Sequence, residues 1–415
     1  MKKIRINVIV MLITISYFVL MEPRYFYYIK TLKTIWYGMI GGVDIILIVA
    51  HIRYKFKLSI ITKLVIIYHA YLALITFAHK GDIRTAVIDS AIFIGLCLCT
   101  EIGIQYNAAR TIRSLLAVLE AEVFINIITI ILFPRGLYST AYFTNNYFLG
   151  YDNQNINILL PMLVIAIICA EYGDSVDRLN LILVTAMTAF TVIFFWSGAS
   201  LVVIAIIMGI YFSGAYKIHW LFNFRNYLIC NFVFFYLFVI LEIPEYFSRI
   251  VVVLLGKSTT FSGRIYFWRR TIELIRKNPI LGYGVEFENE RVIKYALSRH
   301  YHISSRYNIY VGLHAHNRYL ETMYRGGFIL TILYLLCLYL VVKNLMKNKK
   351  QICAAILALG LFAYLTGMLT EFYRLSYLFF PMMTLSMYVK TIETSFEQYR
   401  KRTTLIQLRK VRIIL

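Results

Sequence analysis

Charged residues are scarce in this chain: they make up 15% of its 415 residues, whereas 60% of the residues are hydrophobic. This composition excludes an ordinary soluble domain and predicts an all-α protein that crosses a membrane many times. Each crossing needs about 20 mostly apolar residues, and a helix satisfies its own backbone hydrogen bonds in lipid.

Cysteine is also sparse, and all six cysteines lie within apolar runs. None lies in the polar segment 244–319, so neither a disulfide nor a cysteine-bound metal is predicted there. The basic N-terminus is followed by an apolar run without the small-residue cleavage site of a signal peptide. We therefore expect this run to be retained as the first membrane helix.

About twelve apolar windows have the length of a membrane span. They cover residues 6–21, 35–52, 59–78, 86–104, 112–133, 156–170, 179–196, 199–216, 227–243, 320–342, 351–369 and 375–390. The chain thus divides into spans over 1–243, a large loop over 244–319, further spans over 320–390 and a basic tail over 391–415. Because the tail is partly amphipathic, it is predicted to lie on the membrane surface.

The net charge of +22 does not indicate nucleic-acid binding, because the basic residues cluster beside apolar runs. Near a surface they also favour anionic lipids by about 1 kcal/mol each. With the N-terminus inside, 22 basic residues fall in the inner segments and seven in the short outer loops. This asymmetry predicts that both termini are cytoplasmic and that the loops 134–155 and 244–319 lie outside.

The large loop is strongly basic. It holds five acidic residues and twelve basic ones: Arg249, Lys257, Arg264, Arg269, Arg270, Arg276, Lys277, Arg291, Lys294, Arg299, Arg306 and Arg318. A positive loop on the outer side indicates an anionic ligand at the outer leaflet. The alternative is a solvated loop beside anionic lipid.

Arg264 begins a predicted amphipathic helix, Arg264 to Lys277. Ile265, Trp268, Ile272 and Ile275 form one apolar stripe on this helix, which Arg264 borders. A cation in the first turn opposes the helix dipole by typically 0.3–1 kcal/mol, so its place is better explained if it binds a phosphate there. The alternative is an interfacial arginine that extends to lipid head groups.

His316 lies where the loop becomes the next helix, a place where an imidazole can act as a general base near neutral pH. Glu321 and Arg325 are spaced to stabilise the first turns of that helix. A metal site remains an alternative, since two His-x-His elements could supply four nitrogens, from His300, His302, His314 and His316.

Several ionisable residues fall inside the predicted spans: Asp44, His69, Asp89, Glu101, Glu120 and Glu122. Charges are costly in lipid, so these side chains are expected to face the interior of the bundle or to lie near span ends. They would equally suit a transporter.

Together these motifs resemble the signature of O-antigen ligases and bacterial polysaccharide polymerases. The match comprises Ser262-Gly263-Arg264, Trp268, Asn278-Pro279-x-x-Gly282-x-Gly284 and His316-Asn317-x-Tyr319-Leu320, with Gly327 following. The twelve spans with one large outer loop are similar too. Two departures stand out: Leu330 replaces a second glycine, and Ser197-Gly198 stands where ligases often carry an arginine.

The resemblance implies a metal-independent, inverting glycosyltransferase with a GT-C-like helical fold and no cofactor. Its donor would be an undecaprenyl-pyrophosphate-linked glycan, with Arg264 binding pyrophosphate and His316 acting as base or positioning the acceptor. The further candidates for substrate binding are Asn317, Trp268, Arg269, Arg270, His314 and Arg318. A second phosphate arginine would have to come from Arg84, Arg135, Arg374, Arg269 or Arg270.

We therefore expect a polymerase of lipid-linked repeat units in the bacterial cytoplasmic membrane. Its expected partners are membrane lipids and, from the same pathway, a flippase and a chain-length regulator. The missing ligase-type arginine favours polymerase over ligase. A flippase for lipid-linked sugars is the alternative of another class, and it predicts cations along the spans. A membrane sensor is a third reading, disfavoured by the short loop and the many spans.

Overall fold

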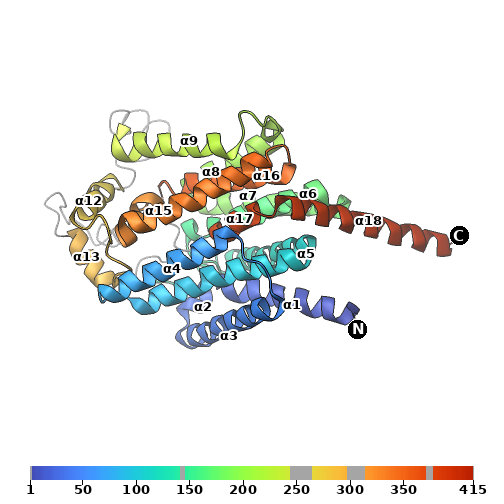
Figure 1. The fold of residues 1–415 in the computed structure, drawn as a ribbon, viewed down its shortest axis with the longest axis horizontal. Helices are drawn as coiled ribbons and strands as arrows, with labels where there is room; N and C mark the ends of the chain where they lie inside the picture. Colours follow the sequence, from blue (N-terminus) through green and yellow to red (C-terminus); the bar gives the residue numbers. More distant parts are fainter. Residues whose placement is uncertain (1, 141–144, 244–263, 297–313, 371–376, 415) are drawn as a thin grey trace.

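The structure, a computed structural model, describes residues 2–140, 145–243, 264–296, 314–370 and 377–414 (Figure 1). These residues form helices, and their only β-type pairings are two isolated bridges, Tyr138–Asn146 and Tyr147–Gly150. The all-α prediction is therefore confirmed. The helices are α1 (Lys2–Met21), α2 (Arg24–Tyr28), α3 (Lys30–Tyr54), α4 (Ile60–Ala78), α5 (Ile83–Leu132), α6 (Ile156–Tyr172), α7 (Ser175–Phe195), α8 (Gly198–Phe212), α9 (Phe224–Phe235), α12 (Arg264–Lys277), α13 (Glu288–Ala296), α15 (Arg318–Lys347), α16 (Ile352–Gly367), α17 (Phe379–Ser386) and α18 (Val389–Ile414).

Within the described residues, six helical segments are long and apolar enough to cross a membrane: Lys30–Tyr54, Ile60–Ala78, Ile83–Leu132, Asp152–Tyr172, Ser175–Phe195 and Arg318–Lys347. Shorter apolar helices accompany them, over Val8–Met21, Ser200–Phe212, Phe224–Ile240 and Ile352–Gly367. The helix α5 contains two of the predicted spans, because Asn107 interrupts it with φ −162° and ψ 98°. The predicted window 375–390 begins outside the described residues, and α17 within it has only 8 residues.

The centre of the bundle is formed by α6 and α16, which are buried along almost their whole length. Both helices are apolar on every side, as expected for helices surrounded by other helices. Gly360 allows α16 to approach α6 closely, because a Cβ atom there would lie 2.7 Å from Cγ2 of Val164. Small residues at helix contacts are typical of membrane bundles.

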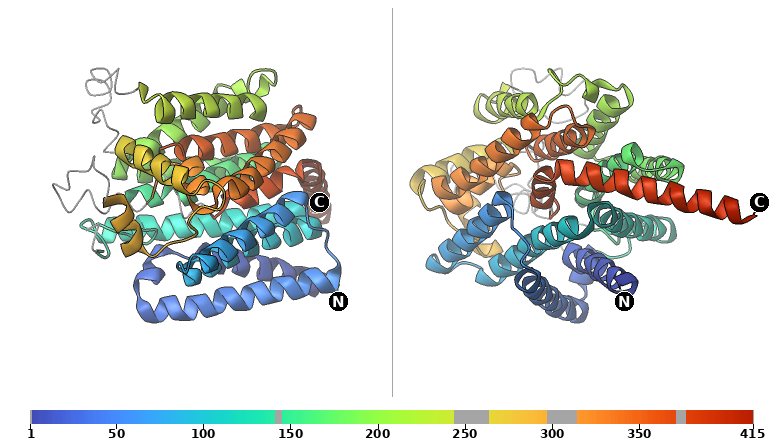
Figure 2. Two further views of the ribbon diagram at one scale, coloured as in Figure 1. Left: turned by 60° about the vertical axis from the view of Figure 1, so that its left-hand side comes forward. Right: turned by 45° about the vertical axis from the view of Figure 1, so that its right-hand side comes forward.

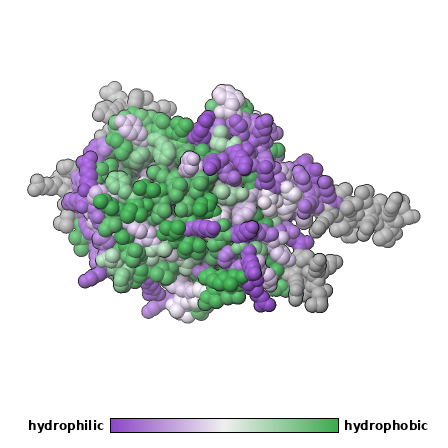
Figure 3. Space-filling model, in the orientation of Figure 1, coloured by the Kyte–Doolittle hydropathy of each residue, from purple (hydrophilic) through white to green (hydrophobic). Residues whose placement is uncertain are grey.

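Large apolar side chains are exposed on the outer helices, among them Ile45, Ile52, Leu74, Phe77 and Leu179. Figure 3 shows apolar residues across the middle of one face and polar residues gathered towards both ends. An apolar surface of this extent is unfavourable in water and marks the part of a protein that lipid covers. The chain is a membrane protein.

The ionisable residues within the spans are mostly interior. His69 (3% exposed), Asp89 (9%), Glu101 (0%) and Glu122 (0%) are buried, as predicted, whereas Asp44 and Glu120 are half-buried. Glu101 accepts hydrogen bonds from the Ser59 amide at 3.0 Å and from Thr62 Oγ1 at 2.7 Å. Its carboxylate therefore joins α5 to the start of α4.

The bundle has two distinct ends (Figure 1). The helices α12 and α13 lie at one end with the start of α15, and both chain termini lie towards the other, where α18 extends beyond the bundle (Figures 1 and 2). The helix α12 packs on α15 through a second apolar core, separate from the main one, which contains Ile265, Phe267, Trp268, Leu274, Ile275, Ala315, Leu320 and Tyr324. The end of the bundle that carries the sequence motifs is therefore a packed structure.

Candidate functional site

Two glycine motifs far apart in the sequence pack against each other. Tyr283 N donates to the carbonyl oxygen of Tyr324 at 3.0 Å, and Gly284 N donates to that of Arg325 at 2.8 Å. Gly282 has φ +72°, and a Cβ atom there would lie 2.6 Å from the backbone of Gly326 and Gly327. Gly327, at φ +59°, interrupts α15 and faces the carbonyl of Ile280. The glycines at both positions thus permit a close approach of two backbones.

The same loop is attached to the helices α4 and α5. Val285 N donates to Thr76 Oγ1 at 2.9 Å, and Asp82 N donates to the carbonyl oxygen of Val285 at 2.7 Å. A Cβ atom on Gly284 would lie 2.6 Å from Cα of Thr76, so the loop passes close to the backbone of α4. These contacts fix residues 282–285 between α4 and α15.

The predicted helix from Arg264 to Lys277 is present as α12 and ends at Lys277 as predicted; Arg264 is the first described residue of this stretch. Ile265, Trp268 and Ile275 of its stripe are buried and Ile272 is half-buried. Since Trp268 (0% exposed) lies within the core between α12 and α15, its observed contribution is packing.

The next two arginines of α12 are engaged in protein contacts. Arg269 forms a two-point ion pair with Glu242. Arg270 donates to Glu273 at 2.8 Å and to the carbonyl oxygen of Lys294 at 2.7 Å, which joins α12 to α13.

Arg264 is half-buried, at the first described position of α12. Burial raises the pKa of Tyr151 to about 12, and nearby Asp152 acts in the same direction, whereas Arg24 and Arg264 both act to lower it. The positive charges of Arg24 and Arg264 therefore both favour the ionised form of the Tyr151 phenol. Arg24 was not among the phosphate ligands predicted from the sequence, where it figured only as a basic residue of a short outer loop. No local pattern marks it, because its place depends on how α2 packs against residues 146–151.

The other arginines considered as a second phosphate ligand lie elsewhere. Arg84 lines the cavity described below, Arg135 is exposed after α5, and Arg374 lies outside the described residues. At the position where ligases carry an arginine, Ser197 Oγ donates to Asn153 Oδ1 at 2.6 Å.

His316 has an unusual backbone conformation, with φ +47°. The left-handed region typically costs a non-glycine residue about 1–3 kcal/mol and is concentrated at functional sites. Its ring lies on the α12 side, 6.1 Å from the Phe267 ring centre. Asn317, the next residue, caps α15 by accepting a hydrogen bond from Leu320 N at 3.1 Å, and its Nδ2 donates to Leu369 O at 2.8 Å.

Arg318 points into the bundle. It is 6% exposed, its backbone amide donates to Met368 O at 2.9 Å, and its guanidinium lies 5.7 Å from the ring centres of both Tyr334 and Phe380. Aromatic faces stabilise a buried cation in this way.

Glu321 is the centre of a buried network. Its carboxylate accepts from Arg291 at 2.7 and 2.6 Å, from Arg325 Nε at 2.7 Å and from Ala315 N at 3.0 Å. Nδ1 of His314 lies 3.6 Å away from it. The predicted pair with Arg325 is present, but it is one part of a larger arrangement that joins α13, residues 314–315 and α15.

The pKa of His314 is lowered to about 4, first by burial and also by the cations Arg291 and Arg325, against the opposite effect of Glu321. The imidazole is therefore neutral near pH 7, and it is 31% exposed. It faces a cavity, whereas His316 lies on the side of α12.

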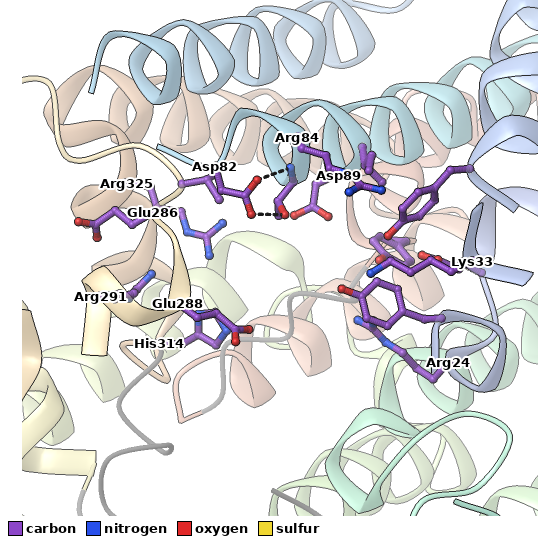
Figure 4. Close-up of a pocket in the computed structure, with 17 residues that line it drawn as sticks. Arg24, Lys33, Asp82, Arg84, Asp89, Glu286, Glu288, Arg291, His314 and Arg325 are labelled. Atoms are coloured by element: carbon purple, nitrogen blue, oxygen red, sulfur yellow. Dashed lines mark hydrogen bonds between the residues drawn. The ribbon is translucent and has the colours of Figure 1, made fainter. Parts of the chain in front are cut away.

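The cavity has a volume of about 330 Å³ (Figure 4). Arg24 and Lys33 reach it from one side, Asp82, Arg84 and Asp89 from the start of α5, and five further ionisable residues from the side of α13 and α15. These five are Glu286, Glu288, Arg291, His314 and Arg325, and Glu22 also lines the cavity. Tyr27, Tyr37 and Tyr377 add phenol groups. Its strongly polar lining suits a hydrophilic ligand.

Among the residues that the structure describes, no three His, Cys, Asp or Glu side chains are grouped so as to hold a metal ion. The candidates His300 and His302 lie outside this part of the chain, as do Arg249, Lys257, Ser262, Gly263, Arg299 and Arg306.

Comparison with known proteins agrees with these motifs. Residues 181–335 match the family model described as O-antigen ligase, a stretch that runs from α7 into α15 and includes Arg264 and His316. No curated protein matches the chain. The chain therefore carries a domain of the O-antigen ligase family across residues 181–335.

Proposed function

We propose that the protein polymerises undecaprenyl-pyrophosphate-linked oligosaccharide repeat units into a surface polysaccharide. The reaction takes place at the outer face of the cytoplasmic membrane and proceeds by inverting glycosyl transfer. The product is a capsule, an exopolysaccharide or an O-antigen. The match of residues 181–335 to the O-antigen ligase family supports a membrane enzyme of polysaccharide synthesis.

The packing of α12 on the start of α15 is the observation that carries the proposal. It brings Arg264, on α12, and His316, just before α15, to the same end of the bundle. Arg264 and Arg24 both act on Tyr151, which supports them as two cations for one diphosphate. Guanidinium groups bind phosphate oxygens in pairs of charge-assisted hydrogen bonds.

The proposed reaction joins two lipid-linked units. A hydroxyl oxygen of the acceptor forms a bond to the anomeric carbon of the donor, while the bond from that carbon to the phosphate oxygen breaks. The undecaprenyl pyrophosphate leaves with the bonding electron pair, and Arg264 and Arg24 stabilise its charge. The imidazole of His316 takes the hydroxyl proton. Attack from the face opposite the leaving group inverts the anomeric configuration.

The topology belongs to the same proposal. Residues 1–243 and 320–390 hold the membrane helices, 244–319 form the extracytoplasmic loop, and 391–415 form a cytoplasmic tail. This orientation places the cavity and α12 on the side where lipid-linked units are displayed. A flippase and a chain-length regulator of the same pathway are the proposed protein partners.

A ligase is the second candidate, favoured by the description of the matching family. It would use the same donor and transfer the glycan to a lipid or protein acceptor. Against it stands Ser197, which occupies the place of the arginine that ligases often carry. A flippase forms no glycosidic bond. It would therefore not need the cation motif and the imidazole motif to lie at the same end of the bundle.

The test is reconstitution of purified protein with lipid-linked repeat units, with product length as the readout. We expect long chains to form in EDTA without added divalent cation, because the cations of the site neutralise the leaving diphosphate. A parallel reaction with a lipid acceptor separates the candidates: transfer to that acceptor without chain extension would establish a ligase. Movement of the lipid-linked unit across the membrane without any new glycosidic bond would establish a flippase.

A further inference from the structure

Lys33 and Arg84 form a cationic wall of the cavity. Lys33 Nζ lies 3.6 Å from the ring centre of Tyr27 and 5.7 Å from that of Tyr37. The guanidinium of Arg84 lies 6.0 Å from the same Tyr37 ring centre. Within the described part of the chain, neither cation forms an ion pair with a carboxylate, so their charges are met only by aromatic faces.

The charges on the opposite wall are largely compensated within the protein. Arg291 and Arg325 both bind Glu321, and Glu286 binds Lys294 and the Tyr324 hydroxyl. On the side of α5, Asp82 accepts from Thr85 N at 3.0 Å and from Thr85 Oγ1 at 2.6 Å (Figure 4). Among the described residues, the cations of the cavity without a carboxylate partner are therefore Lys33, Arg84 and Arg24, which lies 5.2 Å from the Tyr27 ring centre. This positive charge favours a ligand with a negative group between Lys33 and Arg84.

The rest of the lining argues against a bare diphosphate in this cavity. Glu22, Asp89 and Glu288 contribute further carboxylates to it, and a multiply charged anion would be repelled by them. A sugar with a single carboxylate fits better, because carboxylates and phenols can bind its hydroxyl groups. The volume of about 330 Å³ is within the range of small-ligand pockets, about 300–1,000 Å³.

We propose that this cavity is a binding site for an acidic sugar of the glycan, one that carries a carboxylate. Lys33 and Arg84 bind the carboxylate, and Glu22 and Asp89 accept hydrogen bonds from the sugar hydroxyls. The inference rests on the proposed function and narrows its substrate to an acidic repeat unit. Arg24 lines this cavity, and its Cγ lies 3.3 Å from the Cβ position of Gly150, the residue before Tyr151, so the bound sugar lies beside the proposed diphosphate position.

Direct binding to the purified protein in lipid nanodiscs tests the site. The probes are glucuronate, galacturonate and N-acetylneuraminate, the methyl ester of each, and inorganic pyrophosphate. We expect at least one acid to bind about tenfold or more tightly than its own ester, the usual effect of one charge-assisted bond, and the binding to weaken with salt. If no acid exceeds its ester, or if pyrophosphate binds more tightly than every acid and displaces it, the proposal is wrong.

Variants locate the site. Lys33→Gln and Arg84→Gln should each weaken binding of the acid about tenfold or more, and Lys33→Arg should retain most of it. Lys30→Gln, on the same helix but exposed and outside the cavity, is the matched control and should bind normally. Thermal unfolding of each variant confirms that it is folded. Unchanged binding in both Gln variants would place the sugar elsewhere and overturn the assignment.

The two proposals can fail separately. Arg264→Ala should still bind the acid, because Arg264 does not line the cavity. A protein that polymerises repeat units but binds no acidic sugar would contradict this inference alone. A protein that binds the acid at Lys33 and Arg84 but forms no glycosidic bond would contradict the proposed function and leave the site in place.

Discussion

Arg291 of α13 and Glu321 of α15 form a two-point ion pair across 30 residues of sequence, with nitrogen–oxygen distances of 2.7 and 2.6 Å. The Glu321 side chain is 0% exposed and that of Arg291 is 5% exposed. A buried pair of this kind adds little net stability over apolar residues, but removal of one partner leaves an uncompensated charge. The pair therefore fixes the position of α13 against α15, next to His314 and His316.

Glu321→Gln should destabilise the protein by about 3–5 kcal/mol, because the buried guanidinium groups of Arg291 and Arg325 would lose their common carboxylate. The measurement is thermal unfolding of the purified variant in detergent or nanodiscs. Glu273→Gln is the matched control: it removes an exposed i,i+3 partner of Arg270 and should cost at most about 1 kcal/mol. Equal effects of the two substitutions would show that the network does not hold this end of the bundle together.

Arg264→Ala should abolish long-chain product while the protein remains at a normal level in the membrane. The reason is the loss of a charge-assisted phosphate contact of roughly 1.5–3 kcal/mol. Arg264→Lys should rescue only part of the activity, because an ammonium group cannot reproduce the two-point geometry. Arg276→Ala, at an exposed position in the last turn of α12, is the control. Full activity of Arg264→Ala in the reconstituted assay would exclude the diphosphate role.

His316→Ala should lower turnover about 10²–10⁴-fold and change the pH profile, as expected for loss of a general base. His314→Ala should have the smaller effect on turnover, with its main effect on the affinity for the glycan, because His314 faces the cavity. The pKa of His314 is about 4, so its ring is neutral throughout pH 5.5–8.5 and adds no inflection there. The assay compares turnover and affinity of both variants over this range. Small, equal losses would mean that neither histidine is the base.

Gly282→Ala should impair folding or insertion more than a substitution at an open glycine. The added Cβ would lie 2.6 Å from the backbone of α15, and φ +72° is strained for alanine. Gly209→Ala is the control, because a Cβ atom at that position meets nothing within 4 Å. The yield of folded protein and its unfolding temperature provide the comparison, and two variants of equal stability would contradict the close contact between the motif loop and α15.

Features that depend on neighbours along the chain could be predicted from the sequence. The apolar stripe of α12 repeats with the helical period, so the sequence predicted this helix, its end at Lys277 and the burial of Ile265 and Trp268. The apolar windows likewise predicted an all-α membrane protein, because the length of a span is set by the thickness of the bilayer. The spacing of Glu321 and Arg325 indicated a local pair, which is present.

Contacts between distant segments were decided only by the tertiary structure. The spacing of the motifs indicated that Gly282 and Gly327 matter, but not that the two backbones touch. The sequence likewise could not show that Arg291 completes the Glu321 network, or that Arg24 and Arg264 act on the same phenol. The physical reason is that helical periodicity constrains residues three or four positions apart, whereas these groups meet through the packing of whole helices and the loops that join them.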